Sequence, residues 1–268
     1  MFLQIKQILL NALWLISCDT GELTLVANIP NHLKEVSATE ITSKSDLIWM
    51  VEDAGNDNHL YGLDENGNIK KDLTVLNSVN RDWEDLTSDK NGNLYIGDFG
   101  NNSRKRKKFT IYKILNPESA NGIISAEKIN FELPKGVKSK DFEAFFIYED
   151  SFYIFSKESK NCVMLKVPDK IGSHTAALVT EFNLEGKHNL VTSADISDDG
   201  RTVVLLNHDK VWKLTHFKTD NFFDGTIESF SFGHTSQKEG VCFKNNSTLY
   251  LTDESNGAEG SNIYAFKL

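Results

Sequence analysis

The stretch Asp82–Thr87 (DWEDLT), followed by Asn93–Asp98 (NLYIGD), shows the pattern that this chain repeats. An acidic residue opens a short apolar strand, a polar turn follows, and a second apolar strand ends in an acid or an amide. The pattern recurs at Ala38–Thr42 with Leu47–Val51, Asp141–Phe146 with Ser151–Ser156, Ser193–Ser197 with Thr202–Leu206, and Lys238–Phe243 with Thr248–Asp253. Periods of about 40–50 residues built from four strands are typical of β-propeller blades.

Runs of β-branched and aromatic residues between turn signals predict four antiparallel strands in each repeat. The expected strands are 39–42, 47–51, 59–63 and 69–76; 83–88, 94–97, 109–114 and 128–133; 142–148, 152–156, 163–167 and 177–182; 193–197, 203–206, 211–214 and 226–232; and 240–243, 249–252 and 263–266. The last repeat is therefore one strand short. Leu23–Ile29 precedes the first repeat without a partner, so we expect it to complete the last blade and close the ring.

These patterns predict an all-β fold, a β-propeller of five four-stranded blades closed by the N-terminal strand. A six-bladed ring is the alternative, but it needs a sixth repeat that the sequence does not offer. The chain has 268 residues, of which 40% are hydrophobic, and residues 19–268 are expected to form a single propeller domain. The net charge of −9 argues against binding to nucleic acid, and we expect a monomer.

The first 18 residues do not fit the propeller pattern. Met1–Lys6 carries one positive charge, and Ile8–Ile16 is an apolar run too short to span a bilayer, as in a signal peptide. The run ends in Leu15–Cys18 (LISC), which resembles a bacterial lipobox. Residues 1–18 are then a lipoprotein signal peptide with Cys18 as the lipidated residue. An ordinary secretory signal with an incidental cysteine is the alternative.

Lipidation at Cys18 predicts attachment to a membrane by the lipid anchor only. The expected location is the bacterial cell envelope, as an outer-membrane lipoprotein that is periplasmic or surface-exposed. The remaining cysteines, Cys162 and Cys242, lie in different repeats and are expected to be buried free thiols. No Cys/His cluster has the spacing of a zinc site.

Three short stretches carry a resemblance to known proteins: Trp83–Asp85, Leu94–Asn102 and Glu239–Val241. Together they resemble a group of secreted bacterial propellers that includes the SdiA-regulated family, NHL-repeat proteins and lactonase-like propellers. The resemblance covers most of residues 35–268. It implies a propeller fold, often with a calcium ion near the channel, and it implies no single reaction.

Acidic residues at strand starts suggest a site at one mouth of the central channel, because the innermost strands of all blades begin at the same end. The expected ring consists of Glu40, Glu84, Glu143, Asp195 and Glu239. Clustered carboxylates recruit a cation, and oxygen ligands suit Ca²⁺. The alternative is that these acids accept hydrogen bonds from backbone N–H groups of neighbouring blades.

A basic run is expected in the loop between the second and third strands of the second repeat, on the same rim. Arg104, Lys105, Arg106 and Lys107 form this run and are candidates for binding an anion such as a phosphate or an acidic glycan. A solvated turn is the other interpretation.

The sequence thus favours an exported binding or interaction module that takes a small molecule, a glycan or a protein at the channel mouth. The alternative is a Ca²⁺-dependent hydrolase of a lactone, a phosphoester or a sugar derivative. For the hydrolase, Glu40, Asp195 and Asn207 could stand for parts of a lactonase-like site, but the Glu-Gly-Pro start and an Asn-Asp catalytic pair are missing. We therefore assign no catalytic residue.

The lipobox generates a first prediction. Cells fed a fatty-acid analogue should incorporate the label into this protein, and Cys18→Ala should abolish the incorporation, because the thiol is the acyl acceptor. Equal labelling of the two proteins would contradict a lipid anchor at Cys18.

Overall fold

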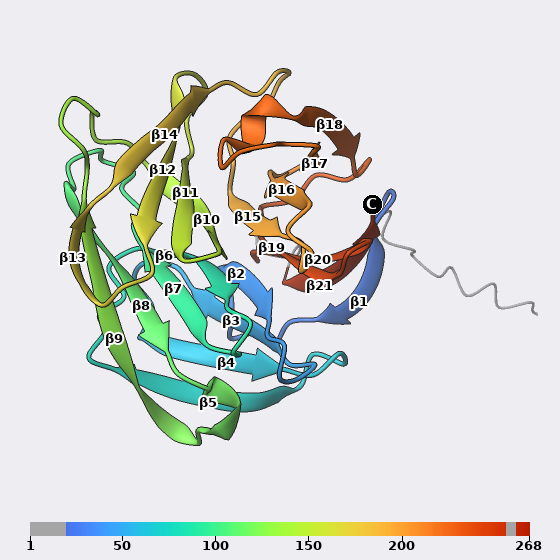
Figure 1. The fold of residues 1–268 in the computed structure, drawn as a ribbon. Coiled ribbons are helices and arrows are strands. Elements are labelled where there is room, and N and C mark those ends of the chain that lie inside the picture. Colours follow the sequence, from blue (N-terminus) through green and yellow to red (C-terminus); the bar gives the residue numbers. More distant parts are fainter. Residues whose placement is uncertain (1–19, 256–260) are drawn as a thin grey trace, which may run out of the picture.

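The computed structural model describes residues 20–255 and 261–268, in which every long element is a β-strand, as predicted for an all-β fold (Figure 1). Two short 3-10 turns, η1 (Pro117–Ser119) and η2 (Phe222–Asp224), interrupt the strands. The expected signal segment 1–18, with Cys18, lies outside the described residues. Within the described part, no helix is long and apolar enough to cross a membrane.

Successive strands form antiparallel runs of four, and each run starts near the centre of the molecule (Figure 1). The innermost strands are β2 (Val36–Ile41), β6 (Trp83–Ser88), β10 (Phe142–Tyr148), β15 (Ser193–Ile196) and β19 (Lys238–Asn245). The second strands are β3 (Ile48–Glu52), β7 (Leu94–Asp98), β11 (Ser151–Ser156), β16 (Thr202–Leu206) and β20 (Thr248–Asp253). The third strands are β4 (His59–Leu63), β8 (Lys108–Ile114), β12 (Cys162–Pro168), β17 (Lys210–Thr215) and β21 (Asn262–Lys267). The outer strands are β5 (Ile69–Leu76), β9 (Gly122–Glu132), β14 (Ala177–Phe182), β18 (Thr226–Ser231) and β1 (Thr24–Asn28).

The N-terminal strand completes the last run, as the sequence predicted. β1 pairs antiparallel with β21, from Thr24 opposite Ala265 to Asn28 opposite Asn262. The innermost strands β19 and β2 also contact each other. Their contact is close at Gly240, where an added Cβ would lie 2.7 Å from the backbone N of Thr39. The first and last parts of the chain are therefore in contact twice, through the innermost strands β2 and β19 and through the outer pair β1 and β21.

Two pairings depart from the repeat pattern. β9 starts at Gly122, six residues before the expected strand, and its first part pairs parallel with β5. The runs β2–β5 and β6–β9 thereby join into one sheet. A further strand, β13 (Gly172–Thr175), pairs parallel with the other end of β9. The sequence pattern missed both because each joins a strand to a different repeat, which local periodicity does not report.

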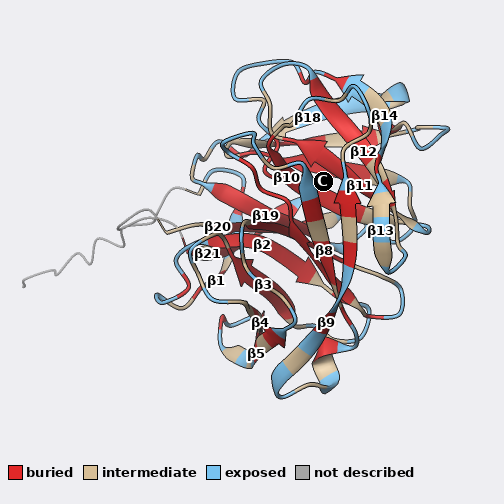
Figure 2. Ribbon diagram, turned by 90° about the vertical axis from the view of Figure 1, so that its left-hand side faces the viewer, coloured by how far each residue is buried: buried red, intermediate tan, exposed pale blue. Residues whose placement is uncertain are grey.

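The core lies in layers between neighbouring runs. Trp49 and Trp83 are fully buried between the first and second runs, and Tyr95 packs edge-on against Phe152 with ring centroids 5.0 Å apart. Figure 2 shows the buried residues concentrated in the inner strands, whereas β9 and β18 carry many exposed residues. The two cysteines of the described part, Cys162 and Cys242, are buried and free, as predicted.

Closure by the N-terminal segment generates the next prediction. Leu23 and Ile29 flank β1 and are 4% and 1% exposed, whereas Leu25 is 48% exposed. Leu23→Ala or Ile29→Ala should lower the free energy of unfolding by about 2–4 kcal/mol, because each leaves a cavity in the core. Leu25→Ala, the matched control, should change it by less than about 0.5 kcal/mol. Equal denaturant midpoints for all three variants would mean that this segment does not hold the last run in place.

Candidate functional site

A register shift recurs at the second position of four innermost strands. In β2, β6, β10 and β19 the pairing with the second strand skips one residue, namely Ser37, Glu84, Glu143 and Glu239. Bulges of this kind re-aim a side chain and are frequent next to functional sites. Three of the four skipped residues are acidic, and all three are buried. We call the end of the channel that they define the bulge mouth.

A lysine stands between two of these acids. Lys157 Nζ lies 2.7 Å from Glu143 Oε2 and 3.9 Å from Glu239 Oε2. The other oxygen of Glu239 lies 3.0 Å from His208 Nε2. Burial opposes the charge of Lys157, but the carboxylates of Glu239 and Glu143 outweigh it and raise the lysine pKa above its usual value. Glu143 and Glu239 therefore already have cationic partners on the protein.

The sequence did not single out Lys157, although a signal was available. Lys157 directly follows a second strand, as Asp53 and Glu254 do in their own runs. In this position, directly after the second strand, Lys157 is basic, whereas Asp53 and Glu254 are acidic. Its contacts with Glu143 and Glu239 join two runs that lie far apart in sequence.

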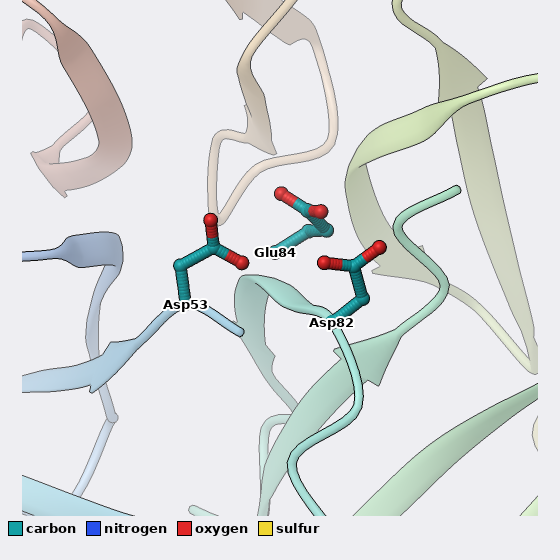
Figure 3. Close-up of side chains that lie close together, drawn as sticks. All are labelled: Asp53, Asp82 and Glu84. Atoms are coloured by element: carbon teal, nitrogen blue, oxygen red, sulfur yellow. The ribbon is translucent and has the colours of Figure 1, made fainter. Parts of the chain in front are cut away.

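Glu84, the third acid of the bulge mouth, faces two further carboxylates, those of Asp53 and Asp82. Asp53 follows β3, Asp82 precedes β6 and Glu84 lies in β6, and one oxygen of each lies within 4.8 Å of the others (Figure 3). The backbone of Gly100 covers two of them: an added Cβ would lie 1.8 Å from Glu84 Oε1 and 2.6 Å from Asp82 Oδ2. Any side chain at this position would displace both carboxylates, so glycine allows the backbone to lie against them.

Repulsion and burial dominate the electrostatics of this group. Burial, followed by the charges of Glu143, Asp53 and Asp82, raises the pKa of Glu84 well above its usual value. Burial also raises the pKa of Asp53 to about 6. A bound cation would stabilise the ionised forms. Carboxylate oxygens with no nitrogen or sulfur among them suit a hard ion such as Ca²⁺, whose remaining ligands would be water or a bound molecule.

The structure does not bring the five expected acids into one ring. Glu40 and Asp195 lie away from the bulge mouth and line a cavity of about 670 Å³ beside the turns that link the first and second strands. The residues equivalent to Glu84 are Ser37 and Thr192, whose hydroxyls donate to the carbonyls of the next innermost strand, at Trp83 and Lys238. Glu40 and Asp195 come three residues later, which is about 10 Å further along a strand.

This second pair of acids accepts hydrogen bonds from backbone groups, and Asp195, whose donor lies in the neighbouring strand β19, matches the alternative interpretation, whereas the backbone donor of Glu40 lies in its own strand. Asp195 Oδ2 accepts from Phe243 N at 2.7 Å, and Glu40 Oε1 accepts from Ile41 N at 2.8 Å. Burial raises the pKa of Asp195 to about 7. Burial and the nearby charge of Asp195 raise the pKa of Glu40 well above its usual value.

Asp85 lies between the two mouths and was not among the expected site residues. Its Oδ2 accepts from Phe145 N at 3.0 Å and from Ala194 N at 3.2 Å. Its Oδ1 accepts from Ser193 Oγ at 2.9 Å and from Leu86 N at 3.0 Å. One carboxylate thus joins β6, β10 and β15, which indicates a structural role.

The basic loop lies beside the bulge mouth, but its four residues behave differently. Arg104 forms a bidentate pair with Glu158, with Nε and Nη2 2.9 and 3.1 Å from the carboxylate. Arg106 Nη2 lies 2.8 Å from Asp98 Oδ1, and Arg106 also donates to the carbonyl of Gly100. Lys105 and Lys107 are exposed. Arg104 and Arg106 therefore fix the loop to the rest of the protein, whereas the charged side chains of Lys105 and Lys107 are exposed to solvent.

Comparisons with known proteins support the fold. No protein-family profile and no curated protein matches this chain. Among solved structures, it is similar to a chain of a nidogen–laminin complex, with a TM-score of 0.52 and 10% identity over 82% of this chain and 73% of that one. It is also similar to a gluconolactonase from Xanthomonas campestris, with a TM-score of 0.48 and 10% identity over 87% of this chain and 72% of that one. At such identity the first similarity supports a propeller fold and says nothing about activity.

The pair Glu40–Asp195 generates a prediction about pH. Both acids have folded-state pKa values above their unfolded values, so the folded protein binds more protons and this pair destabilises it increasingly as pH rises from about 4 to about 7. Glu40→Gln should therefore be more stable than the parent protein at pH 8, by about 1–3 kcal/mol. The difference should vanish near pH 4.

Urea unfolding at several pH values measures this effect. Glu149→Gln, which removes an exposed acid from the same cavity, is the control and should follow the parent protein. If the Glu40→Gln curve also runs parallel to that of the parent protein, the pKa of Glu40 is not raised in the folded state.

Proposed function

We propose that this chain is an exported, lipid-anchored β-propeller that acts as a binding module and holds Ca²⁺ at the bulge mouth. One observation carries the proposal: the oxygens of Asp53, Asp82 and Glu84 lie within 4.8 Å of one another. Within the described residues, none of the three forms an ion pair with a lysine, an arginine or a histidine within 4.0 Å. The charges of Arg106 and Lys157 act on Asp82 and Glu84 only from beyond that distance, and a cation bound between the three carboxylates would relieve their remaining repulsion directly.

We also infer that the runs of four strands are five blades of one domain, residues 19–268. The inference rests on the innermost strands, which contact one another in sequence order from β2 to β19, while β19 contacts β2. Closure of the ring by β1 is consistent with this count.

Of the five acids expected from the sequence, Glu84 remains a proposed Ca²⁺ ligand, joined by Asp53 and Asp82. Glu143 and Glu239 are left out because Lys157 Nζ, 2.7 Å from one carboxylate and 3.9 Å from the other, already pairs with both. A bound Ca²⁺ would supply positive charge and open coordination positions for oxygen atoms of a ligand. The proposed ligand is a small molecule, a glycan or a protein segment that reaches the bulge mouth and offers such oxygens.

The alternative function, a Ca²⁺-dependent hydrolase of a lactone, a phosphoester or a sugar derivative, is favoured by Glu254. This residue lies outside the three-carboxylate group, and its Oε2 accepts from Gln237 Nε2 at 3.0 Å. Burial, followed by the charges of Glu239 and Asp53, raises the pKa of Glu254 to about 7. A carboxyl group that titrates near neutral pH can both donate and accept a proton, as general acid–base catalysis requires.

The proposed location is the bacterial cell envelope, with the protein held as an outer-membrane lipoprotein by acylated Cys18. The proposal rests on the lipobox and on the apolar run before it. We further propose a monomer that does not bind nucleic acid, in line with the net charge of −9.

Removal of metal tests the Ca²⁺ site. A chelator should lower the melting temperature, and Ca²⁺ should restore it, because an ion at about 100 times its Kd adds about 2.7 kcal/mol of stability. Asp82→Asn with Glu84→Gln should abolish this response. Glu40→Gln, which removes an acid at the other end of the channel, should keep it.

The same samples separate the two functions. Hydrolysis of a lactone or a phosphoester that disappears with chelator would favour the enzyme, and its absence together with retained Ca²⁺ binding would favour the module. A melting temperature that ignores both chelator and Ca²⁺, with no metal in the purified protein, would reject the site.

A further inference from the structure

A second cavity, of about 540 Å³, opens on the side of the molecule, where β8, β9 and β13 lie next to one another. We call it the side groove. Its lining includes the basic residues Arg81, Arg106, Lys108, Lys128 and His174. None of its lining residues belongs to the group Asp53, Asp82 and Glu84. Its volume lies in the range of small-molecule sites.

The charge of the side groove is opposite to that of the whole chain. Glu132 is its only acidic lining residue, although the net charge of the chain is −9. Among the described residues, Arg81, Lys108 and Lys128 form no ion pair with a carboxylate. Lys108 and Lys128 therefore present positive charge that no direct ion pair within the described residues neutralises, whereas the charge of Arg81 also acts on Asp98.

The strand register places polar groups beside these cations. Lys108, Thr110 and Tyr112 alternate along β8 and so point to the same face. Opposite them on β9 lie Glu132, Asn130 and Lys128, in that order. Lys128 Nζ lies over the ring of Tyr112, 5.9 Å from its centre.

Hydrogen-bonding groups on β9 and β13 complete the groove. Thr110 Oγ1 donates to Asn130 Oδ1 at 3.1 Å. Within the described residues, no hydrogen bond uses the N–H groups of the Asn130 side-chain amide. The pairing of β13 with β9 adds Ser173 and Thr175 to the lining. The groove thus offers neutral donors and acceptors between its cationic side chains.

We propose that the side groove binds a small polyhydroxylated anion, with its phosphate or carboxylate at one of the two exposed lysines that flank the neutral groups, Lys108 or Lys128, and its hydroxyls at those neutral groups. Charge-assisted hydrogen bonds from lysine and arginine hold such anions well. The sequence suggested anion binding at the basic loop Arg104–Lys107, but of these four residues only Arg106 lines the side groove. The proposed anion site therefore lies beside β8 and β9 and not at the tip of the loop. It does not depend on a metal at the bulge mouth.

Titration calorimetry with the full-length protein tests the proposal. The probes are glucose 6-phosphate, glucuronate, inorganic phosphate and glucose, where glucose is the neutral control. Binding of glucose 6-phosphate or glucuronate, but not of glucose, is expected, and added salt should weaken it. The relative affinities of the two sugar anions distinguish a phosphate from a carboxylate ligand.

Two double variants with equal loss of charge locate the site. Lys108→Gln with Lys128→Gln should weaken binding by about tenfold or more, whereas Lys105→Gln with Lys107→Gln should leave it within about twofold. The lysines of both variants are exposed, so neither change should unfold the protein, which the melting temperature verifies. Equal weakening in both variants, or no binding of either sugar anion by the parent protein, would overturn the proposal.

Discussion

The buried carboxylate of Asp85 is the interaction on which the centre of this molecule depends. Four hydrogen bonds reach it from β6, β10 and β15, and Ser193, one of its donors, accepts in turn from Val241 N of β19. Burying a carboxylate is costly unless its oxygens are fully hydrogen-bonded. Burial still raises the pKa of Asp85 well above its usual value, so the hydrogen bonds reduce this cost without cancelling it. Because the donors come from three innermost strands, they reduce it only when all three hold their places, so the positions of these strands become interdependent.

The register shift near the start of the innermost strands then divides the remaining acids between two ends of the channel. It turns Glu84, Glu143 and Glu239 toward the bulge mouth, whereas Glu40 and Asp195 lie beyond Asp85, toward the other mouth. This separation weakens the repulsion that one ring of five carboxylates would create. It also gives the two ends different chemistry, since the acids beyond Asp85 are bound mainly by backbone N–H groups.

Basic side chains of the protein compensate some of these acids and leave others without an ion pair. Lys157 pairs with both Glu143 and Glu239, and Arg106 pairs with Asp98. Among the groups discussed above, no ion pair within 4.0 Å in the described part of the chain involves the acidic group Asp53, Asp82 and Glu84 at one mouth, or Lys108 and Lys128 of the side groove. Two regions of opposite potential on one scaffold attract ligands of opposite charge, so the proposed metal site and the proposed anion site would not compete for the same ligand.

Local sequence determined the strands, and tertiary structure decided what they bring together. The expected strands 83–88 and 142–148 have the bounds of β6 and β10, because apolar residues between turn signals suffice to define them. The missing strand of the last repeat likewise pointed to residues 23–29. The sequence analysis placed Glu40 and Glu84 in one ring, but Glu40 lies three residues further along its strand than Glu84 does. The alternation of apolar residues did not reveal this difference, because neither the skipped residue nor the three-residue offset changes it. Lys157 beside Glu143 and Glu239, and β13 beside β9, depend on contacts between distant segments, and local periodicity carries no information about which distant segment a strand will meet.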